Sequence, residues 1–186
     1  MIYLFLGIAA IPFIYYLIAI YSSLRYFHQP AAPPAPVFLP AVSNLKPIRG
    51  LDPEAYENLA SFCRQDYPEY EIVFCVDSDD EAVIETIQRL KADFPEREIR
   101  VLYGSGRIAT NDKVAKLARL VSDARYETVV ISDSDVRVQP DYLRRVTAPL
   151  ADPKVGAVTC FYAPTEVKTF TDHLQATGMT SDSGRL

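Results

Sequence analysis

The 186-residue chain contains no tryptophan and only three cysteines. Cys63, Cys75 and Cys160 are odd in number and show no Cys-x-x-Cys spacing, which argues against a disulfide framework and against a zinc knuckle. No basic cluster occurs and the net charge is −5, so the composition argues against nucleic acid as a partner. Cys75 stands in an apolar run, where we expect it to pack as a small hydrophobic side chain.

The N-terminal segment carries no charged side chain before Arg25, and residues 2–21 are almost wholly apolar and aromatic. A helix of that length can cross roughly 30 Å of hydrocarbon, so residues 1–27 are predicted to form a single-pass transmembrane anchor. A cleaved secretory signal is the alternative, but no Lys or Arg precedes the run, which is long for a signal core. Basic residues flank only its C-terminal side, which favours a cytoplasmic location for the rest of the chain.

The remaining chain is predicted to contain a spacer and one α/β domain. Residues 28–40 are rich in proline and alanine, a composition typical of a semi-rigid linker. Strands are expected over residues 37–45, 71–76, 99–103, 128–132 and 155–160. Helices are expected from Asp52, over 81–92, around 114–121 and over 140–150, with one more around 169–176. Regular alternation of strand and helix indicates parallel crossovers, hence a doubly wound sheet within residues 41–186.

Acidic residues follow two of the predicted strands. Asp77, Asp79 and Asp80 come after the strand over 71–76, and Asp133 and Asp135 come after the strand that we expect at the centre of the sheet. Ligands of open α/β sheets bind outside the carboxyl ends of the strands. Two aspartates there can share a hard divalent cation with the oxygens of a diphosphate. Turns and helix caps are the alternative, and either Asp79 or Asp80 is expected to cap the helix that follows.

Five short motifs then occur in one order: residues 45–53 (LKPIRGLDP), 66–68 (DYP), 75–80 (CVDSDD), 111–113 (NDK) and 133–138 (DSDVRV). In this order they resemble the processive-type nucleotide-sugar glycosyltransferases, in the branch of the ceramide glucosyltransferases and their bacterial relatives linked to hopanoid synthesis. The resemblance covers residues 1 to about 160. It implies a GT-A fold, the Rossmann-like doubly wound sheet of the nucleotide-diphospho-sugar transferases.

The same resemblance implies roles for individual residues. The expected donor-binding residues are Pro47, Asp77, Asp79, Asp80, Lys113 and Asp133. Asp80 is the expected first essential acid, with Asp79 as the alternative, and Asp133 and Asp135 form the expected pair for Mg²⁺ or Mn²⁺. The implied reaction moves a hexose from a UDP-sugar to the hydroxyl of a membrane lipid, with inversion at the anomeric carbon. The implied partners are a UDP-sugar, a lipid acceptor and a membrane.

The chain also departs from the family pattern. Family members carry a third acidic residue as general base and an Arg/Gln-x-x-Arg-Trp motif. The absence of tryptophan excludes that motif from this chain, and Glu166, Asp172 and Asp182 match no family acid. We therefore expect a truncated, donor-binding half with the general base beyond Leu186 and very low activity of its own. An inactive, membrane-tethered nucleotide-binding remnant is the alternative.

Two other enzyme classes have partial support. Residues 104–109 fit the dinucleotide fingerprint G-x-G-x-x-A, but they follow the third strand and no acid stands at the expected distance, which weakens a nicotinamide enzyme. Phosphatases of the haloacid dehalogenase type also place Asp-x-Asp at a strand end. Their motif opens the domain and has Thr or Val where this chain has Arg137. His28 and His173 lie outside the predicted sheet and are poor catalytic candidates.

Overall fold

The computed structural model describes residues 2–28, 38–52, 54–104, 111–160, 169 and 171. The chain divides into two compact units. One consists of Met1–Pro34 and Thr159–Leu186, and the other is Ala35–Val158. The second unit holds the sheet and all the residues that the sequence singles out for chemistry.

The first unit contains α1 (Ile2–Phe27), a helix with Pro12 inside it. Large apolar side chains are exposed along it, with Ile11, Phe13 and Tyr15 each about two-thirds accessible. Among the described residues, no helix combines the length and the apolar character needed to cross a membrane. The transmembrane anchor predicted over residues 1–27 is therefore not supported. Most of the predicted spacer over 28–40 lies outside the described residues.

Four parallel strands form the sheet of the second unit, in the order β3-β2-β1-β4. They are β1 (Val42–Pro47), β2 (Tyr70–Val76), β3 (Glu98–Tyr103) and β4 (Thr128–Ile131). Leu45 of β1 pairs with Val73 on one side and with Ile131 on the other. Within the described sheet β1 is therefore an inner strand that brings the ends of β2 and β4 to its two sides.

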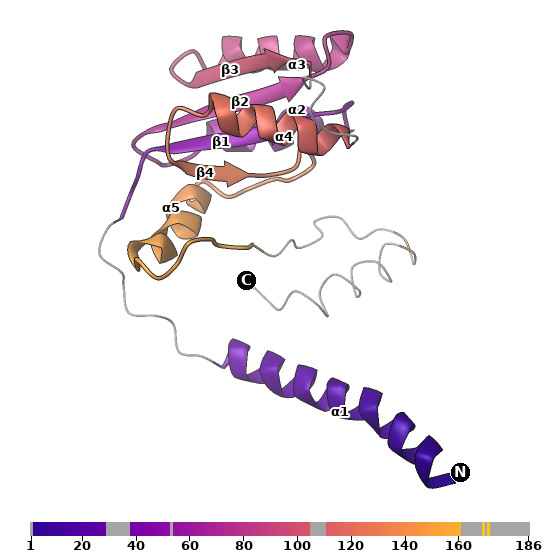
Figure 1. Cartoon of the computed structure of the whole chain (residues 1–186). Helices are drawn as coiled ribbons and strands as arrows, with labels where there is room; N and C mark the ends of the chain where they lie inside the picture. The colour runs from indigo at the N-terminus through magenta and orange to yellow at the C-terminus, as the bar shows by residue number, and fades with distance from the viewer. Residues whose placement is uncertain are drawn as a thin grey trace. The chain divides into compact units, whose positions relative to one another are not determined.

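Helices cover both faces of this sheet, as expected for a doubly wound fold. They are α2 (Ala55–Cys63), α3 (Glu81–Asp93), α4 (Asp112–Asp123) and α5 (Tyr142–Thr147), followed by the 3-10 turn η1 (Ala148–Ala151). Figure 1 shows α4 across one face of the sheet and α2 on the other. Phe62 of α2 packs with Phe74 and Ile87 in the largest core cluster, whereas Leu120 of α4 packs against Leu45 on the opposite face. The α/β prediction with a parallel sheet is confirmed.

Some predicted elements differ from the structure at their ends. The first strand begins at Val42 and runs through Lys46 to Pro47, because both residues continue the ladder with β2. The first sheet helix begins at Ala55, and Asp52 contributes its main-chain carbonyl, which accepts a hydrogen bond from the Ala55 N–H. The helix start predicted at Asp52 is therefore wrong, and Glu54 is the N-cap.

Two further predictions concern burial and strand position. The strand that ends near Asp133 is an edge strand of the described sheet, not a central one, and Val129 and Ile131 are exposed. The strand predicted over residues 155–160 is wrong, because these residues form no ladder with the described strands. An extended segment without a neighbour leaves its main-chain groups to solvent. The helix predicted around 169–176 lies outside the described residues.

Candidate functional site

A cavity of about 560 Å³ opens at the carboxyl ends of β1 and β4, beside the N-terminus of α4. Its size is within the range of small-molecule sites. Its lining residues come from three segments: Pro47, Ile48, Arg49 and Asp52; Asn111, Asp112, Lys113 and Lys116; and Asp133, Ser134 and Asp135. The cavity therefore lies at the edge of the sheet where the sequence predicted a ligand.

The two aspartates after β4 both line this cavity. Asp133 is 44% exposed and its Oδ1 accepts a hydrogen bond of 2.6 Å from Lys113 Nζ. Asp135 is exposed, and its main-chain carbonyl accepts from Asn58 Nδ2 over 3.4 Å. Among the described residues, no group of three or more His, Cys, Asp or Glu forms a metal site. The chemistry of the pair fits Mg²⁺ or Mn²⁺, which prefer carboxylate oxygens, provided that other oxygen ligands complete the coordination shell.

Lys46 contacts the turn that carries the two aspartates, and the sequence did not identify it as a site residue. Its side chain is fully buried, with Nζ 3.4 Å from the centre of the Phe62 ring and 3.0 Å from the main-chain carbonyl oxygen of Asp133, to which it donates. Burial lowers the pKa of Lys46 from 10.5 to about 7, although the carboxylates of Asp133 and Asp135 act in the opposite direction. The available signal was a lysine that directly follows the predicted strand over residues 37–45.

Lys116 is a second buried ammonium group that the sequence did not reveal. Its side chain is 1% exposed, and Nζ donates to the carbonyl of Ile48 over 2.9 Å and to Asp77 Oδ2 over 2.8 Å. Asp112 Oδ2 lies 3.1 Å from the same nitrogen. Burial disfavours the charged form, but the hydrogen bonds to Asp77 and Asp112 outweigh it and raise the pKa of Lys116. Lys116 thus joins the ends of β1 and β2 to α4 as a charged group.

The burial of Lys116 changes which face of α4 packs on the sheet. The sequence predicted a helix marked by Val114, Leu117, Leu120 and Val121, with these side chains as its apolar residues. In the structure the buried residues of α4 are Ala115, Lys116 and Leu120, while Val114 and Val121 are about half exposed. The helix is present as predicted, but its inward face is rotated toward the buried lysine.

The acidic run after β2 divides into three different environments. Asp77 binds Lys116, and Asp79 is exposed. Asp80 is the N-cap of α3, where its Oδ1 accepts from the Val83 N–H over 3.2 Å, so the predicted cap is confirmed. Asp80 Oδ2 accepts from the N–H of Gly50 over 3.1 Å. Asp80 therefore fixes the loop after β1, in which Gly50 has a φ of +69°, while only Asp77 of this run contacts a residue that lines the cavity.

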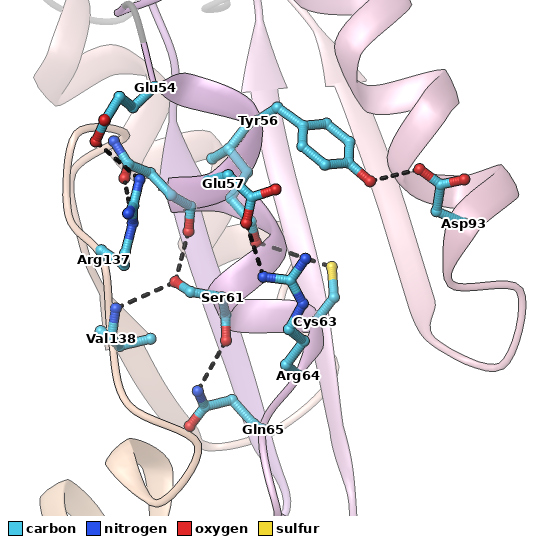
Figure 2. Close-up of polar contacts among 12 residues, drawn as sticks. Glu54, Tyr56, Glu57, Ser61, Cys63, Arg64, Gln65, Asp93, Arg137 and Val138 are labelled. Atoms are coloured by element: carbon cyan, nitrogen blue, oxygen red, sulfur yellow. Dashed lines mark hydrogen bonds and ion pairs between the residues drawn. The ribbon is translucent and has the colours of Figure 1, made fainter.

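Side chains from α2 and its N-cap hold the segment that follows the two aspartates (Figure 2). The N–H of Val138 donates to Ser61 Oγ over 3.1 Å, and Arg137 forms an ion pair of 2.9 Å with Glu54. The other contacts of this kind are Asn58 with Asp135 and Arg137, and Gln65 with Gln139 and Leu143. The turn that carries Asp133 and Asp135 is thus anchored on the C-terminal side of the motif.

Other predicted features are structural or lie outside the described residues. Cys75 is buried between Leu45 and Leu120, as expected, and burial raises the pKa of its thiol. Residues 105–110, which include most of the proposed dinucleotide fingerprint, lie outside the described residues. The same is true of His173, Asp172, Glu166 and Asp182.

Comparison with known proteins identifies relatives of this chain. Residues 4–186 match glycosyl transferase family 21. Ceramide glucosyltransferase 1 of Caenorhabditis elegans is 32% identical over 81% of this chain and 32% of its own length. The ceramide glucosyltransferase of Komagataella phaffii is 33% identical over 67% of this chain and 25% of its own length. The chain therefore spans about a third or less of the curated relatives that it matches.

Among solved structures, the chain is similar to the mannosyltransferase PcManGT from Pyrobaculum calidifontis in complex with GDP-Man and Mn²⁺. The TM-score is 0.67 and the sequence identity 27%, over 82% of this chain and 43% of that protein. This similarity extends the α/β assignment to the GT-A glycosyltransferases, and the match over residues 4–186 confirms the family resemblance of the five motifs. This chain belongs to glycosyl transferase family 21.

Proposed function

We propose that this chain is the donor-binding part of a hexosyltransferase that moves a hexose from a UDP-sugar to the hydroxyl of a membrane lipid of the ceramide or hopanoid type. The observation that carries the proposal is the cavity at the sheet edge, where Asp133 and Asp135 stand beside Lys113 and Lys116. Carboxylates for a cation and ammonium groups for phosphates are the two charges that a metal-bound diphosphate requires. The ceramide glucosyltransferase relatives support a lipid acceptor.

Asp133 and Asp135 are the residues that would hold Mg²⁺ or Mn²⁺. When bound, such a cation supplies positive charge that stabilises the diphosphate as it leaves the anomeric carbon. A complex of PcManGT with GDP-Man and Mn²⁺ supports the choice of a divalent metal. Two protein carboxylates leave coordination positions for the donor itself, so the donor and the cation would occupy the site together.

The chain's own residues would orient the donor on both sides of this pair. Lys113 and Lys116 supply charge for the diphosphate, and the buried Lys116 also fixes the carbonyl of Ile48 at the cavity wall. Pro47 would form a rigid wall for the nucleoside at the end of β1. Asp77 and Asp80, which hold Lys116 and the Gly50 loop, would keep that wall in place. Asp79, exposed beside them, completes the donor-binding set that we propose.

The transfer that we propose inverts the anomeric carbon. The lipid oxygen forms its bond to that carbon from the face opposite to the diphosphate, while the bond to the diphosphate oxygen breaks. Holding the leaving group in a fixed position is therefore the main contribution of this part of the protein. A charged group aimed at the leaving oxygen stabilises the transition state more than the ground state, because negative charge grows there during the reaction.

A lipid acceptor requires the site to operate at a bilayer surface. The exposed apolar side chains of α1, including Ile11, Phe13 and Leu17, support an association of the chain with a membrane. Contiguous exposed apolar surface is typical of sites that contact lipid or another protein. We accordingly propose the membrane as a partner, together with the UDP-sugar and the lipid acceptor.

Isothermal titration of the full chain with UDP, with Mn²⁺ and with EDTA, tests the proposal. Binding of UDP that depends on Mn²⁺ is the expected result. A folded chain that binds no UDP in either condition would instead be an inactive remnant. Trapping of an acyl-phosphate on Asp133 would identify a phosphatase of the haloacid dehalogenase type, and tight NADH binding without UDP binding would identify a nicotinamide enzyme.

A further inference from the structure

One of the two metal-binding carboxylates that we propose already has a positively charged partner. Lys113 Nζ lies 2.6 Å from Asp133 Oδ1, and both side chains line the cavity. Lys113 is 56% exposed and Asp133 is 44% exposed, so both remain accessible to a ligand. A cation that binds Asp133 must therefore compete with the ammonium group of Lys113.

The second observation is that the protein offers few ligands for a cation at this place. Among the residues that the structure describes, no set of three or more acidic, His or Cys side chains could hold a metal ion. Six oxygen ligands are usual for Mg²⁺, so Asp133 and Asp135 alone leave most positions to be filled from outside the protein. The oxygens of a diphosphate are suited to fill them.

We infer that Lys113 is the exchangeable counter-ion of Asp133 and couples the binding of the cation to the binding of the donor diphosphate. This inference rests on the proposed function. As the ligands enter, the cation takes the place of Lys113 at Asp133, and the released ammonium group pairs with a phosphate oxygen. Both side chains are about half exposed, so the exchange of partners does not require either charge to leave water.

Lys116 shows why this role falls to Lys113. Lys116 is 1% exposed and its nitrogen is held by Ile48, Asp77 and Asp112, so it cannot leave its partners without exposing buried charge. Lys113 stands at the start of α4 on an exposed, flexible stem. Of these two ammonium groups at the cavity, Lys113 alone can exchange one partner for another at low cost.

The inference predicts a reciprocal coupling between the two ligands, because an effect of one ligand on the affinity of the other must hold in both directions. Mn²⁺ alone should bind weakly, since it must compete with Lys113 for Asp133 while the diphosphate oxygens that would fill its other coordination positions are absent. UDP alone should also bind weakly, because Lys113 remains with Asp133. When both ligands are present, the cation releases Lys113 from Asp133, and the diphosphate pairs with the released lysine.

The test measures Mn²⁺ binding alone, by electron paramagnetic resonance of the free ion, and UDP binding by calorimetry in Mn²⁺ and in EDTA. In the wild-type chain we expect UDP affinity to rise at least about fivefold with Mn²⁺, at the lower end of ordinary coupling factors. In Lys113→Met, Mn²⁺ alone should bind up to about fivefold more tightly, since a surface ion pair no longer competes. The increase in UDP affinity caused by Mn²⁺ should become smaller. Lys113→Arg should retain the wild-type pattern.

Lys154→Met is the matched control, because it removes one exposed lysine outside the cavity lining and should change neither affinity. Lys113→Gln is measured in parallel as a second neutral variant. The inference is overturned if the neutral Lys113 variants bind Mn²⁺ alone no more tightly than wild type, or if their coupling is unchanged. If wild type binds Mn²⁺ but never UDP, the proposed function fails, while the Mn²⁺ measurements still show whether Lys113 competes for Asp133.

Discussion

The ammonium group of Lys46 donates a hydrogen bond to the main-chain carbonyl of Asp133 over 3.0 Å, from a position that is completely buried. This contact joins the end of β1 to the turn that carries the two aspartates. The ring of Phe62 in α2 also lies near Lys46 Nζ, with its centre at 3.4 Å. The turn is therefore held by a hydrogen bond from a buried ammonium group, and burial disfavours the charged form of that group. The ionisation of Lys46 is consequently linked to the stability of the fold.

The first prediction follows from the lowered pKa of Lys46. Its pKa is about 7 in the folded chain against 10.5 in the unfolded chain, so between these values the unfolded chain binds a proton that the folded chain has released. Stability must rise with pH across that interval. From about pH 7 to about pH 9.5, we expect wild type to gain on the order of 2–3 kcal/mol relative to Lys46→Met, since each pKa unit is worth about 1.4 kcal/mol. Urea denaturation of both proteins at the two pH values provides the measurement, and identical pH responses would contradict it.

The second prediction concerns the aspartates of the cavity. Asp133→Ala and Asp135→Ala should each weaken Mn²⁺-dependent UDP binding by at least about tenfold, because each removes a charged ligand worth roughly 1.5–3 kcal/mol. Glu85→Ala is the control, since Glu85 is an exposed acid on α3 outside the cavity lining. Calorimetric titration at constant Mn²⁺ measures the affinities. Retention of wild-type affinity by both aspartate variants would exclude this pair as the metal site.

The third prediction separates the two neighbouring acids after β2. Asp80 caps α3 and also accepts from Gly50, whereas the Asp79 side chain is exposed. Loss of an N-cap costs about 0.5–2 kcal/mol. We therefore expect Asp80→Ala to lower the free energy of unfolding by about 1–2 kcal/mol, and Asp79→Ala to change it by less than about 0.5 kcal/mol. Equal losses in urea denaturation would show that the two carboxylates share the structural role.

The fourth prediction concerns the buried carboxylate of Glu71 at the other end of the sheet. Burial opposes its charge, but hydrogen bonds from Ser43, the Arg125 N–H and Arg100 prevail and lower the pKa of Glu71. This contribution to stability is present above the usual glutamate pKa of 4.5 and is lost as the pH falls through the lower value of the folded chain. At neutral pH, Glu71→Ala should cost about 3–5 kcal/mol, the usual result of breaking a buried pair.

Glu98→Ala is the matched control for Glu71. Its carboxylate pairs with Arg125 at 3.4 Å, but both side chains are about half exposed. Solvent-exposed pairs of this kind contribute about 0–1 kcal/mol. Thermal or urea denaturation at neutral pH should therefore separate the two variants clearly. A loss in Glu71→Ala no larger than that in Glu98→Ala would mean that the buried network does not stabilise the sheet.

The order of helices and strands was predictable from the sequence because apolar side chains mark the inward faces of most elements. Val83, Ile84, Ile87 and Leu90 were expected to share one face of a helix; in α3 Ile84 is partly buried and the other three are buried. The apolar pattern did not predict which charged side chains are buried in the core. Lys46 and Lys116 are buried, and their ammonium groups are stabilised by hydrogen bonds or ion pairs with residues distant in sequence. A hydrophobic pattern does not predict such partners.

The candidate site was predictable in outline for a similar reason. Strand ends of a parallel sheet lie on one edge, so the sequence predicted that Asp133 and Asp135 would lie at the edge where the cavity opens. Which acids of the run after β2 contact the cavity depends on side-chain direction, which the sequence does not contain. Asp80 and Asp77 differ by three positions, yet one caps a helix and the other binds Lys116.

The anchoring of residues 135–143 by α2 also has a consequence for protein engineering. Ser61 of α2 and Gln65, which follows this helix, bind main-chain groups of that segment, so the loop and the helix form one unit although the bonded residues are 74 to 78 positions apart in the sequence. A chimera that receives only the loop of a relative would lose these partners and loosen the motif. Exchange of specificity within this family should therefore succeed when α2 is transplanted together with the loop.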